Sequence, residues 1–413
     1  MFKSLKAAQA WIESVQKFGP KYDLVRMQNA TQMLNHPEKK VPMIHVAGTN
    51  GKGSTVSFIS HILMAAGYRT GMYISPYIES FNERFMINHV PIDDTALLTL
   101  INEMHAFNLA YHARFFEHLS FFELTTLLAF EYFNNESLDV AVIEVGIGGR
   151  LDATNVITPE VSVITSIGFD HMAILGNTLK EIASEKLGIV KPSVPLVSGV
   201  KDAELIELFE STTQKRGANL IQTDHVTFIP TIPQTFSYQS TPYEINLLGE
   251  HQVANAACAI EATRQLNHRG FTISETAIQA GLKDAFWPGR FETLGPFILD
   301  GAHNYQGVQS LLKAVDAYFK ATPLTIVFGV MGDKDSKAMQ TLLEARAETM
   351  VFTEVDHPRA LAKTVMFDRS MHPNKLMASI DEVASLEGPT LIAGSLYVIS
   401  ATRAKIKERL DAK

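Results

Sequence analysis

The sequence predicts an α/β protein with a parallel-dominated sheet, a small antiparallel patch and a second, smaller Rossmann-like α/β domain. Short apolar runs alternate with helical segments along the chain, as in parallel α/β folds. A glycine-rich turn joins an early apolar run to a helical segment at Val56–Ala66. The 413 residues exceed the length of roughly 250–300 residues at which a single hydrophobic core stops growing. We therefore expect two domains.

Five apolar runs of the first domain are expected to be strands. Each ends in a turn rich in Gly, Ser, Asp or His, and parallel strands end at a common edge of the sheet. Ligands of open parallel sheets bind at that edge, outside the carboxyl ends of the strands. The five runs are Met43–Val46, Thr70–Ile74, Val140–Val145, Val161–Ile167 and Val194–Val197.

The alternation changes between residues 225 and 248, where β-rich runs are separated by Pro and polar turn residues. We expect a small antiparallel patch there, followed by helices at 252–266 and 274–285. A second α/β series begins near residue 296 and divides the chain into domains 1–295 and 296–413. Its strands are expected at Phe297–Leu299, Thr325–Phe328, Met350–Thr353 and Thr390–Ala393.

Composition excludes several classes of protein. Hydrophobic residues make up 46% and charged residues 19% of the chain, and no run of about 18 apolar residues could span a membrane. The first residues lack the apolar core of a signal peptide, so a cytoplasmic location is expected. The net charge of −8 argues against a nucleic-acid partner. The single cysteine, Cys258, rules out an internal disulfide and is expected in the core.

The glycine-rich turn has the properties of a phosphate-binding loop. It places backbone N–H groups and the positive end of a helix dipole before an anion. Val46 stands where the general pattern has its first glycine, and Gly53 directly follows the lysine. A glycine-rich turn without a ligand is the alternative. The turn consists of Gly48, Thr49, Asn50, Gly51, Lys52, Gly53 and Ser54.

Polar residues near the other strand ends are candidate metal ligands. Ser75 is either a Mg²⁺ ligand or a plain turn serine before Pro76, and Glu144 is the one charge in an apolar strand. Such a carboxylate needs a cation or a hydrogen-bond partner. His171 is an unusual ligand for Mg²⁺, which prefers oxygen, and a satisfied loop histidine is the alternative. Lys186, in a helix that starts near Leu179, is expected from its spacing alone to be a surface lysine.

Three turns of the second domain carry polar side chains at matching positions after strands. Asp300–Asn304 puts an acid, an imidazole and an amide on one turn, and Gly332–Asp335 and Gly394–Tyr397 follow later strands. One such turn would be weak support, whereas three at the same edge indicate that this domain also contributes to the active site.

With these residues assembled, the chain resembles the bacterial folylpolyglutamate synthases, many of which are also dihydrofolate synthases, within the Mur ligase superfamily. The resemblance runs nearly end to end, and the departures in the phosphate loop are the form that this family uses. It rests on Gly48–Ser54, Ser75-Pro76, Phe81–Arg84, Glu144–Asn155, Asp170-His171, Glu185–Ile189, His251–Ala256, Pro288–Glu292, Asp300–Asn304 and Gly394-Ser395.

The resemblance implies cofactors and site residues. ATP is expected at Gly48–Ser54, with further contacts from Asn255, Arg290 and Asp300. Mg²⁺, with two ions expected, is assigned to Ser75, Glu144 and His171, and Lys186 matches a family lysine that is carbamylated near the second ion. His303 and Ser395 match the glutamate side. The folate or pterin residues are Arg26, Phe121, Phe122, Glu123 and Asp152, and the catalytic residues are Lys52, Lys186, Asp300 and His303.

The implied reaction is an ATP-dependent ligation. L-glutamate is added to a reduced folate, and in bifunctional members to dihydropteroate, through an acyl phosphate that releases ADP and phosphate. The expected partners are therefore small molecules, with no nucleic acid or membrane, and a monomer is expected. A cell-wall Mur ligase is one alternative, although those enzymes have an extra amino-terminal domain and only 47 residues precede Gly48 here. A non-ligase phosphate-loop ATPase is another, but it would not need His303 and Ser395.

Overall fold

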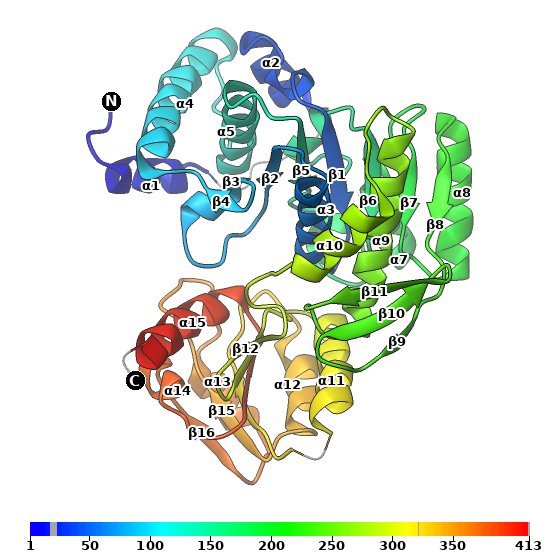
Figure 1. Cartoon of the computed structure of the whole chain (residues 1–413). Helices are drawn as coiled ribbons and strands as arrows, with labels where there is room; N and C mark the ends of the chain where they lie inside the picture. Colours follow the sequence, from blue (N-terminus) through cyan, green and yellow to red (C-terminus); the bar gives the residue numbers. More distant parts are fainter. Residues whose placement is uncertain (17–22, 321, 412–413) are drawn as a thin grey trace. The chain divides into compact units, whose positions relative to one another are not determined.

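The computed structural model describes residues 1–16, 23–320 and 322–411. The chain divides into two units (Figure 1). Unit 1 contains residues 1–167, 171–223 and 255–281, and unit 2 contains residues 168–170, 224–254 and 282–413. Neither unit is one continuous segment, which differs from the single boundary expected near residue 296. The difference arises because residues 224–254 and 282–295 belong to the same unit as the C-terminal region.

Unit 1 contains an eight-stranded sheet in the order β4-β3-β2-β5-β1-β6-β7-β8. Strands β2, β5, β1, β6, β7 and β8 are parallel, and β3 and β4 add an antiparallel edge. The strands are β1 (Met43–Ala47), β2 (Thr70–Tyr73), β3 (Phe85–Ile87), β4 (Val90–Pro91), β5 (Val140–Glu144), β6 (Val161–Ile164), β7 (Leu196–Ser198) and β8 (Leu220–Gln222).

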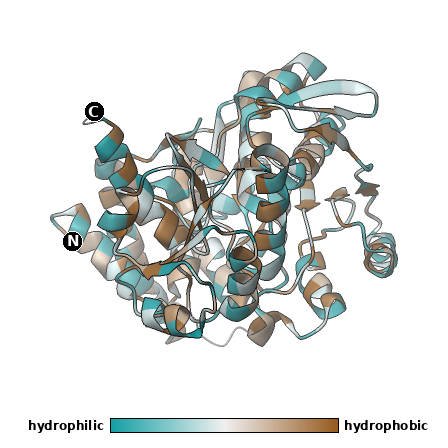
Figure 2. Ribbon diagram, turned by 90° about the horizontal axis from the view of Figure 1, so that it is seen from below, coloured by the Kyte–Doolittle hydropathy of each residue, from teal (hydrophilic) through white to brown (hydrophobic). Residues whose placement is uncertain are grey.

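Ten helices lie before, between and after the strands of this sheet along the described chain. Helices of the chain carry both hydrophobic and hydrophilic residues along the ribbon (Figure 2), as amphipathic helices do. The helices are α1 (Leu5–Ser14), α2 (Val25–Met33), α3 (Lys52–Ala65), α4 (Asp94–Phe115), α5 (Phe121–Asn135), α6 (Met172–Leu175), α7 (Leu179–Leu187), α8 (Ala203–Arg216), α9 (Glu250–Asn267) and α10 (Glu275–Asp284), with 3-10 turns η1 (Pro37–Lys39), η2 (Phe81–Arg84) and η3 (Ala153–Val156).

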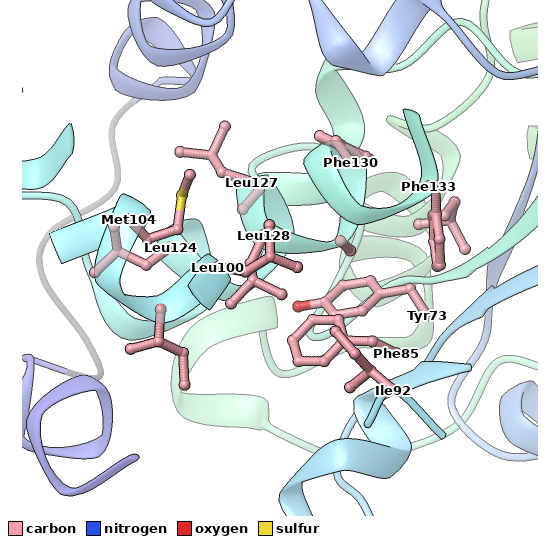
Figure 3. Close-up of a cluster of buried hydrophobic side chains, with 14 of the residues drawn as sticks. Tyr73, Phe85, Ile92, Leu100, Met104, Leu124, Leu127, Leu128, Phe130 and Phe133 are labelled. Carbon is pink, nitrogen blue, oxygen red and sulfur yellow. The ribbon is translucent and has the colours of Figure 1, made fainter. Parts of the chain in front are cut away.

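A large apolar cluster fixes α4 and α5 to one face of the sheet (Figure 3). Leu124, Leu127 and Leu128 of α5 recur at helical spacing and are fully buried. They pack with Tyr73 of β2 and with Phe85 of β3, whose rings stack at 5.8 Å. This packing determines where the first turn of α5, which carries Phe122 and Glu123, meets the carboxyl end of the sheet.

Unit 2 contains two sheets. A three-stranded antiparallel sheet is formed by β9, β10 and β11, and a six-stranded sheet has the order β12-β13-β17-β14-β15-β16, parallel except for β12. The strands are β9 (Thr227–Ile229), β10 (Gln234–Tyr238), β11 (Thr241–Ile245), β12 (Glu292–Leu294), β13 (Phe297–Asp300), β14 (Thr325–Phe328), β15 (Thr349–Phe352), β16 (Lys375–Met377) and β17 (Thr390–Ala393).

The helices of the six-stranded region complete a smaller α/β unit. They are α11 (Tyr305–Phe319), α12 (Ser336–Glu344), α13 (Lys363–Arg369), α14 (Ile380–Ala384) and α15 (Leu396–Asp411). The predicted fold class is confirmed, including the antiparallel patch. Among the described residues, no helix is long and apolar enough to cross a membrane. Cys258 is buried in the core, and burial raises the pKa of its thiol to about 12.

A buried ion pair fastens α15 to the edge of the six-stranded sheet. Arg403 of α15 donates from Nε and Nη2 to both carboxylate oxygens of Glu292, over 2.8–3.0 Å. Their side chains are 6% and 3% exposed, and the Gly289 N–H also donates to Glu292 Oε2. Removing one partner of such a pair leaves the other charge buried without compensation.

We expect Arg403→Ala to lower the free energy of unfolding of unit 2 by about 3–5 kcal/mol. Trp287 is a buried reporter in unit 2, so its fluorescence during urea denaturation, measured in a Trp11→Phe background, follows this unit. Lys405→Ala is the matched control on the same helix, because Lys405 pairs with Asp381 at the surface and should change stability by less than about 1 kcal/mol. Equal losses of unfolding free energy in Arg403→Ala and Lys405→Ala would contradict a special role of the buried ion pair.

Candidate functional site

The predicted phosphate loop connects β1 to α3. Helix α3 begins at Lys52, four residues before the predicted start, because Lys52, Gly53 and Ser54 form its first turn despite the low helix propensity of glycine. Gly51 is the N-cap with φ +83°, and a Cβ there would lie 2.2 Å from Asn255 Oδ1. Glycine is therefore required at this position for both its backbone conformation and its size. The structure also brings Asn255 to the loop.

Lys52 folds back over its own loop. Its Nζ donates to the carbonyl oxygens of Gly48 at 3.0 Å and Thr49 at 3.4 Å. A flexible ammonium held by neutral carbonyls can turn toward an anion that approaches the helix N-terminus. The arrangement thus concentrates positive charge and N–H groups at one point.

Thr165 and Ser166, which lie outside the predicted site, hold the loop from the segment directly after β6. Thr49 N–H donates to the Ser166 carbonyl at 2.9 Å, and Asn50 N–H donates to Ser166 Oγ at 3.0 Å. Thr165 Oγ1 donates to the Asn50 carbonyl at 2.6 Å. Strand β6 ends at Ile164, before the predicted end at Ile167, because the next residues turn toward the loop. The signal was a Thr-Ser pair directly after an apolar strand.

Ser75 and Glu144 lie together at the ends of the neighbouring parallel strands β2 and β5. The Ser75 N–H donates to Glu144 Oε2 at 3.0 Å, and Glu144 is only 6% exposed. A buried carboxylate beside a hydroxyl is an oxygen-donor set that suits Mg²⁺. Among the described residues there is no group of three or more His, Cys, Asp or Glu that could hold a metal ion; the predicted ligand set includes only two residues of these types.

The other two predicted metal-site residues have different surroundings. His171 is the half-buried N-cap of α6, with φ +50°. Lys186 is 4% exposed, so its assignment as a surface lysine is wrong. It is buried because the segment after β5 packs against the end of α7, where Arg150 N–H donates to the Glu185 carbonyl at 2.7 Å. A Cβ at Gly149 would lie 2.9 Å from the Lys186 carbonyl.

Four of the five predicted folate residues form two pairs in unit 1. Arg26 Nε donates to Glu123 Oε1 at 3.1 Å, while Glu123 Oε2 accepts from Ser120 N–H at 2.7 Å in the capping box of α5. Phe122 and Asp152 instead meet beside Gly146, where a Cβ would lie 2.6 Å from the Phe122 ring and 3.0 Å from Asp152 Oδ2. Phe121 packs edge-on to Phe81 with ring centroids 6.4 Å apart.

Asp152 belongs to a buried polar chain that reaches β1. Its Oδ2 accepts from Ile147 N–H at 3.0 Å, and its Oδ1 accepts from the N–H and hydroxyl of Thr154. The Thr154 hydroxyl in turn contacts His45 Nε2 at 2.8 Å. Because the hydroxyl proton goes to the carboxylate, Thr154 accepts from the Nε2–H of His45. The chain connects the residues after β5 to the strand that precedes the phosphate loop.

In unit 2, Asp300 closes the turn around the end of β13. Its carboxylate accepts from Ala302 N–H at 2.8 Å and Phe291 N–H at 2.9 Å and is 4% exposed. Arg290 lies beside the same turn, since a Cβ at Gly301 would be 3.1 Å from its Nη1. Burial lowers the pKa of His251, which also responds to the charges of Asp300 and Arg290. His251 was part of a recognised motif but not of the predicted site.

A second charged cluster surrounds Asp170, which is counted with unit 2. Lys334 Nζ pairs with Asp170 Oδ1 at 2.6 Å, and Asn304 Nδ2 donates to Oδ2 at 3.2 Å. His303 Nε2 is 3.7 Å from Oδ2, and its Nδ1 is 2.8 Å from the Gly301 carbonyl. Since a carbonyl only accepts, Nδ1 carries the hydrogen and Nε2 faces the carboxylate. Lys334 lies in the predicted polar turn Gly332–Asp335, but its pairing with Asp170 was not predicted.

The turns after β13 and β17 lie side by side. Gly394 N–H donates to the Ala302 carbonyl at 3.0 Å, and Ser395, 2% exposed, follows at the start of α15. Ser395 Oγ accepts from Tyr397 N–H at 3.2 Å. The structure therefore brings the predicted residues Asp300, His303 and Ser395 to one edge of the six-stranded sheet.

Two sequence families match the chain. The Mur ligase middle domain matches residues 46–263, and the Mur ligase glutamate ligase domain matches residues 289–395. A phosphate loop on a parallel sheet followed by a smaller α/β region with polar strand ends is thus the architecture of a Mur-type ligase.

Similar proteins define the family more closely. The dihydrofolate synthase/folylpolyglutamate synthase of Bacillus subtilis is 39% identical over 98% of this chain and 100% of its own length. The structure of folylpolyglutamate synthase from Thermotoga maritima has 31% identity and a TM-score of 0.87, and covers 98% of this chain and 96% of that one. A structure described as a folylpolyglutamate synthase–AMPPCP–folate complex has 32% identity and a TM-score of 0.85, over 98% and 99%.

The chain belongs to the dihydrofolate synthase/folylpolyglutamate synthase family of Mur ligases. It is an ATP-dependent ligase that adds glutamate to folate.

The polar chain beneath the site predicts a pH-dependent stability. Burial, with a smaller effect of Lys191, lowers the pKa of His45 from 6.5 to about 3. The unfolded state therefore binds a proton near pH 6.5 while the folded state does not, so stability is lost as the pH falls below 6.5. The loss is about 1.4 kcal/mol for each pH unit between these two values.

We expect His45→Gln to flatten the dependence of unfolding free energy on pH between 6.5 and 4, with a slope smaller than that of the wild type by about 1.4 kcal/mol per unit. Urea denaturation at several pH values measures it. Part of the slope should persist, because burial also lowers the pKa of His89 to about 3. His268→Gln, at an exposed position, is the control. An unchanged slope in His45→Gln would contradict the prediction.

Proposed function

We propose that the loop Gly48–Ser54 binds the phosphates of ATP, which then activates a folate carboxylate for amide formation with L-glutamate. The observation that carries this proposal is the loop geometry: Gly51 caps α3 in a conformation that requires glycine, and Lys52 lies over the loop. A similar protein has been solved with the ATP analogue AMPPCP and folate. The acceptor is a reduced folate, with dihydropteroate as a second acceptor.

The reaction needs an activated acyl group because a carboxylate is a poor acyl donor. Transfer of the terminal phosphoryl group of ATP to the folate carboxylate gives an acyl phosphate and ADP. The glutamate α-amine then attacks the carbonyl carbon, loses a proton and expels phosphate. Lys52 neutralises phosphoryl oxygens during the first step, so the protein mainly contributes positioning and charge stabilisation.

Ser75 and Glu144 are the proposed Mg²⁺ ligands, with His171 as the third. The buried carboxylate and the adjacent serine fit an oxygen-preferring ion. Bound Mg²⁺ would supply charge neutralisation for the phosphate oxygens. A second ion is assigned to Lys186 in its carbamylated form, which presents two oxygens in place of an ammonium.

The glutamate step is assigned to residues of unit 2. The backbone bond of His303 occupies Nδ1 and not Nε2, so Nε2 can accept the proton of the attacking amine, with Asp170 Oδ2 at 3.7 Å. Ser395 is proposed to bind the incoming glutamate. Asp300 orients the turn that carries His303 and, with Arg290 and Asn255, is proposed to contact the nucleotide.

The folate acceptor is proposed to contact Arg26, Phe121, Phe122, Glu123 and Asp152. Phe122 offers a ring for stacking beside Asp152, and Arg26 offers a charge for a carboxylate. We also propose that residues 1–295 bind ATP and folate while residues 296–413 handle glutamate, and that the enzyme works as a cytoplasmic monomer.

Phosphate release should require a pterin acceptor. With ATP and glutamate present, release is expected to rise at least about tenfold on adding tetrahydrofolate or dihydropteroate, because phosphate leaves only after the acyl phosphate is attacked. A coupled phosphate assay with no acceptor as reference measures this. Phosphate release at the same rate with and without the acceptor would contradict ligation.

The variant His303→Ala should retain its affinity for AMPPCP and lose amide formation. An equal loss of both would contradict a role of His303 in the amine step.

Lys186 should carry a carbamate at neutral pH. Native mass spectrometry of the whole chain is expected to show the added mass of one CO₂, which acid should remove. Lys180→Arg provides a control, because Lys180 is an exposed lysine on the same helix and its replacement should leave the added mass. Lys186→Arg should abolish the added mass. Its persistence in Lys186→Arg would contradict the assignment.

A further inference from the structure

The carbonyl of Asn50 in the phosphate loop receives two hydroxyl donors from the end of β6. Thr165 Oγ1 donates to it at 2.6 Å, and Ser166 Oγ donates at 3.0 Å. Ser166 Oγ also accepts from the Asn50 N–H at 3.0 Å. Both the donor and the acceptor of the Asn50 backbone are therefore held by the same short segment.

The direction of this carbonyl determines what the loop presents to an anion. The Asn50 carbonyl and the Gly51 N–H belong to one peptide unit and point in opposite directions. If the unit turned over, the carbonyl oxygen would face the phosphates and the N–H would be lost from the anion site. Gly51 permits both orientations, because glycine adopts positive and negative φ almost equally. Something other than backbone sterics must therefore select the orientation with φ +83°.

We propose that Thr165 and Ser166 are positioning residues that fix the Asn50–Gly51 peptide with its N–H directed to the phosphates. The inference rests on the proposed nucleotide site. Gly48 supports it independently, because a Cβ at Gly48 would lie 1.9 Å from Thr165 Oγ1. The absence of that Cβ leaves the space that the Thr165 hydroxyl occupies.

The hydrogen bonds of Thr165 and Ser166 to the loop are made within the protein and do not depend on a bound anion. Thr165 is 6% exposed, and its N–H is anchored to the Ala47 carbonyl of β1 at 3.0 Å. Thr49 N–H is held by the Ser166 carbonyl at 2.9 Å. A loop whose peptides are already oriented binds its ligand with less loss of conformational entropy. Removing the hydroxyls should thus weaken nucleotide binding more than it weakens the fold.

The test compares AMPPCP affinity by isothermal titration calorimetry in variants of the full chain. Thr165→Val keeps the shape and removes the hydroxyl, and we expect about tenfold weaker binding, the effect of one strong hydrogen bond. Thr165→Ser restores the hydroxyl and should return affinity to within about twofold of the wild type. The double variant Thr165→Val/Ser166→Ala should lose about a hundredfold.

Ser162→Ala is the matched control. Ser162 lies on β6, three residues before Thr165, is fully buried, and donates to the Ile189 carbonyl at 3.2 Å, away from the loop. The Ser162→Ala variant should have a melting temperature similar to that of Thr165→Val, and it should keep the wild-type affinity for AMPPCP. Equal affinity of Thr165→Val and the wild type, or an equal loss in Ser162→Ala, overturns the inference. If the wild type itself fails to bind AMPPCP, the proposed function fails instead.

Discussion

A phosphate loop can bind an anion only if its N–H groups face the ligand, so its carbonyls must find partners on the other side. In this protein Thr165 and Ser166 meet that requirement for the Asn50 carbonyl. The partners are available because β1 lies between β5 and β6 in the sheet. Both neighbours end at the same edge, which is where open parallel sheets bind ligands.

The same requirement explains the polar side chains buried around the loop. Glu144, at the end of β5, accepts from Ser75, and Asp152, a few residues later, accepts three hydrogen bonds within its own turn. A buried carboxylate without such donors would be strongly destabilising. Strand ends that carry acids therefore need nearby N–H and hydroxyl groups, and these groups also hold the acids in place for any ligand.

Much of the fold follows from local sequence. Strands β14 and β17 have the predicted bounds because each is a short apolar run between turn residues. The start of α3 at Lys52 was not predicted, because Gly53 and Ser54 are poor helix formers. Tertiary contacts rather than helix propensity determine where this helix begins. The burial of Lys186 and the pairing of Asp170 with Lys334 could not be predicted, because each depends on residues brought together by the sheet rather than by the sequence.

Two of the predicted folate residues, Asp152 and Glu123, are carboxylates that already have structural partners. Asp152 and Glu123 are engaged with backbone and side-chain donors, yet a carboxylate offers about four acceptor positions, and the described contacts fill three for Asp152 and two for Glu123. The remaining capacity suits N–H donors such as those of a pterin ring. Beside Asp152 it does not suit the carboxylates of the folate tail, which the negative charge of Asp152 would repel. If Asp152 and Phe122 bind folate as proposed, the ring end of the folate would approach them and its carboxylate end would lie away from them.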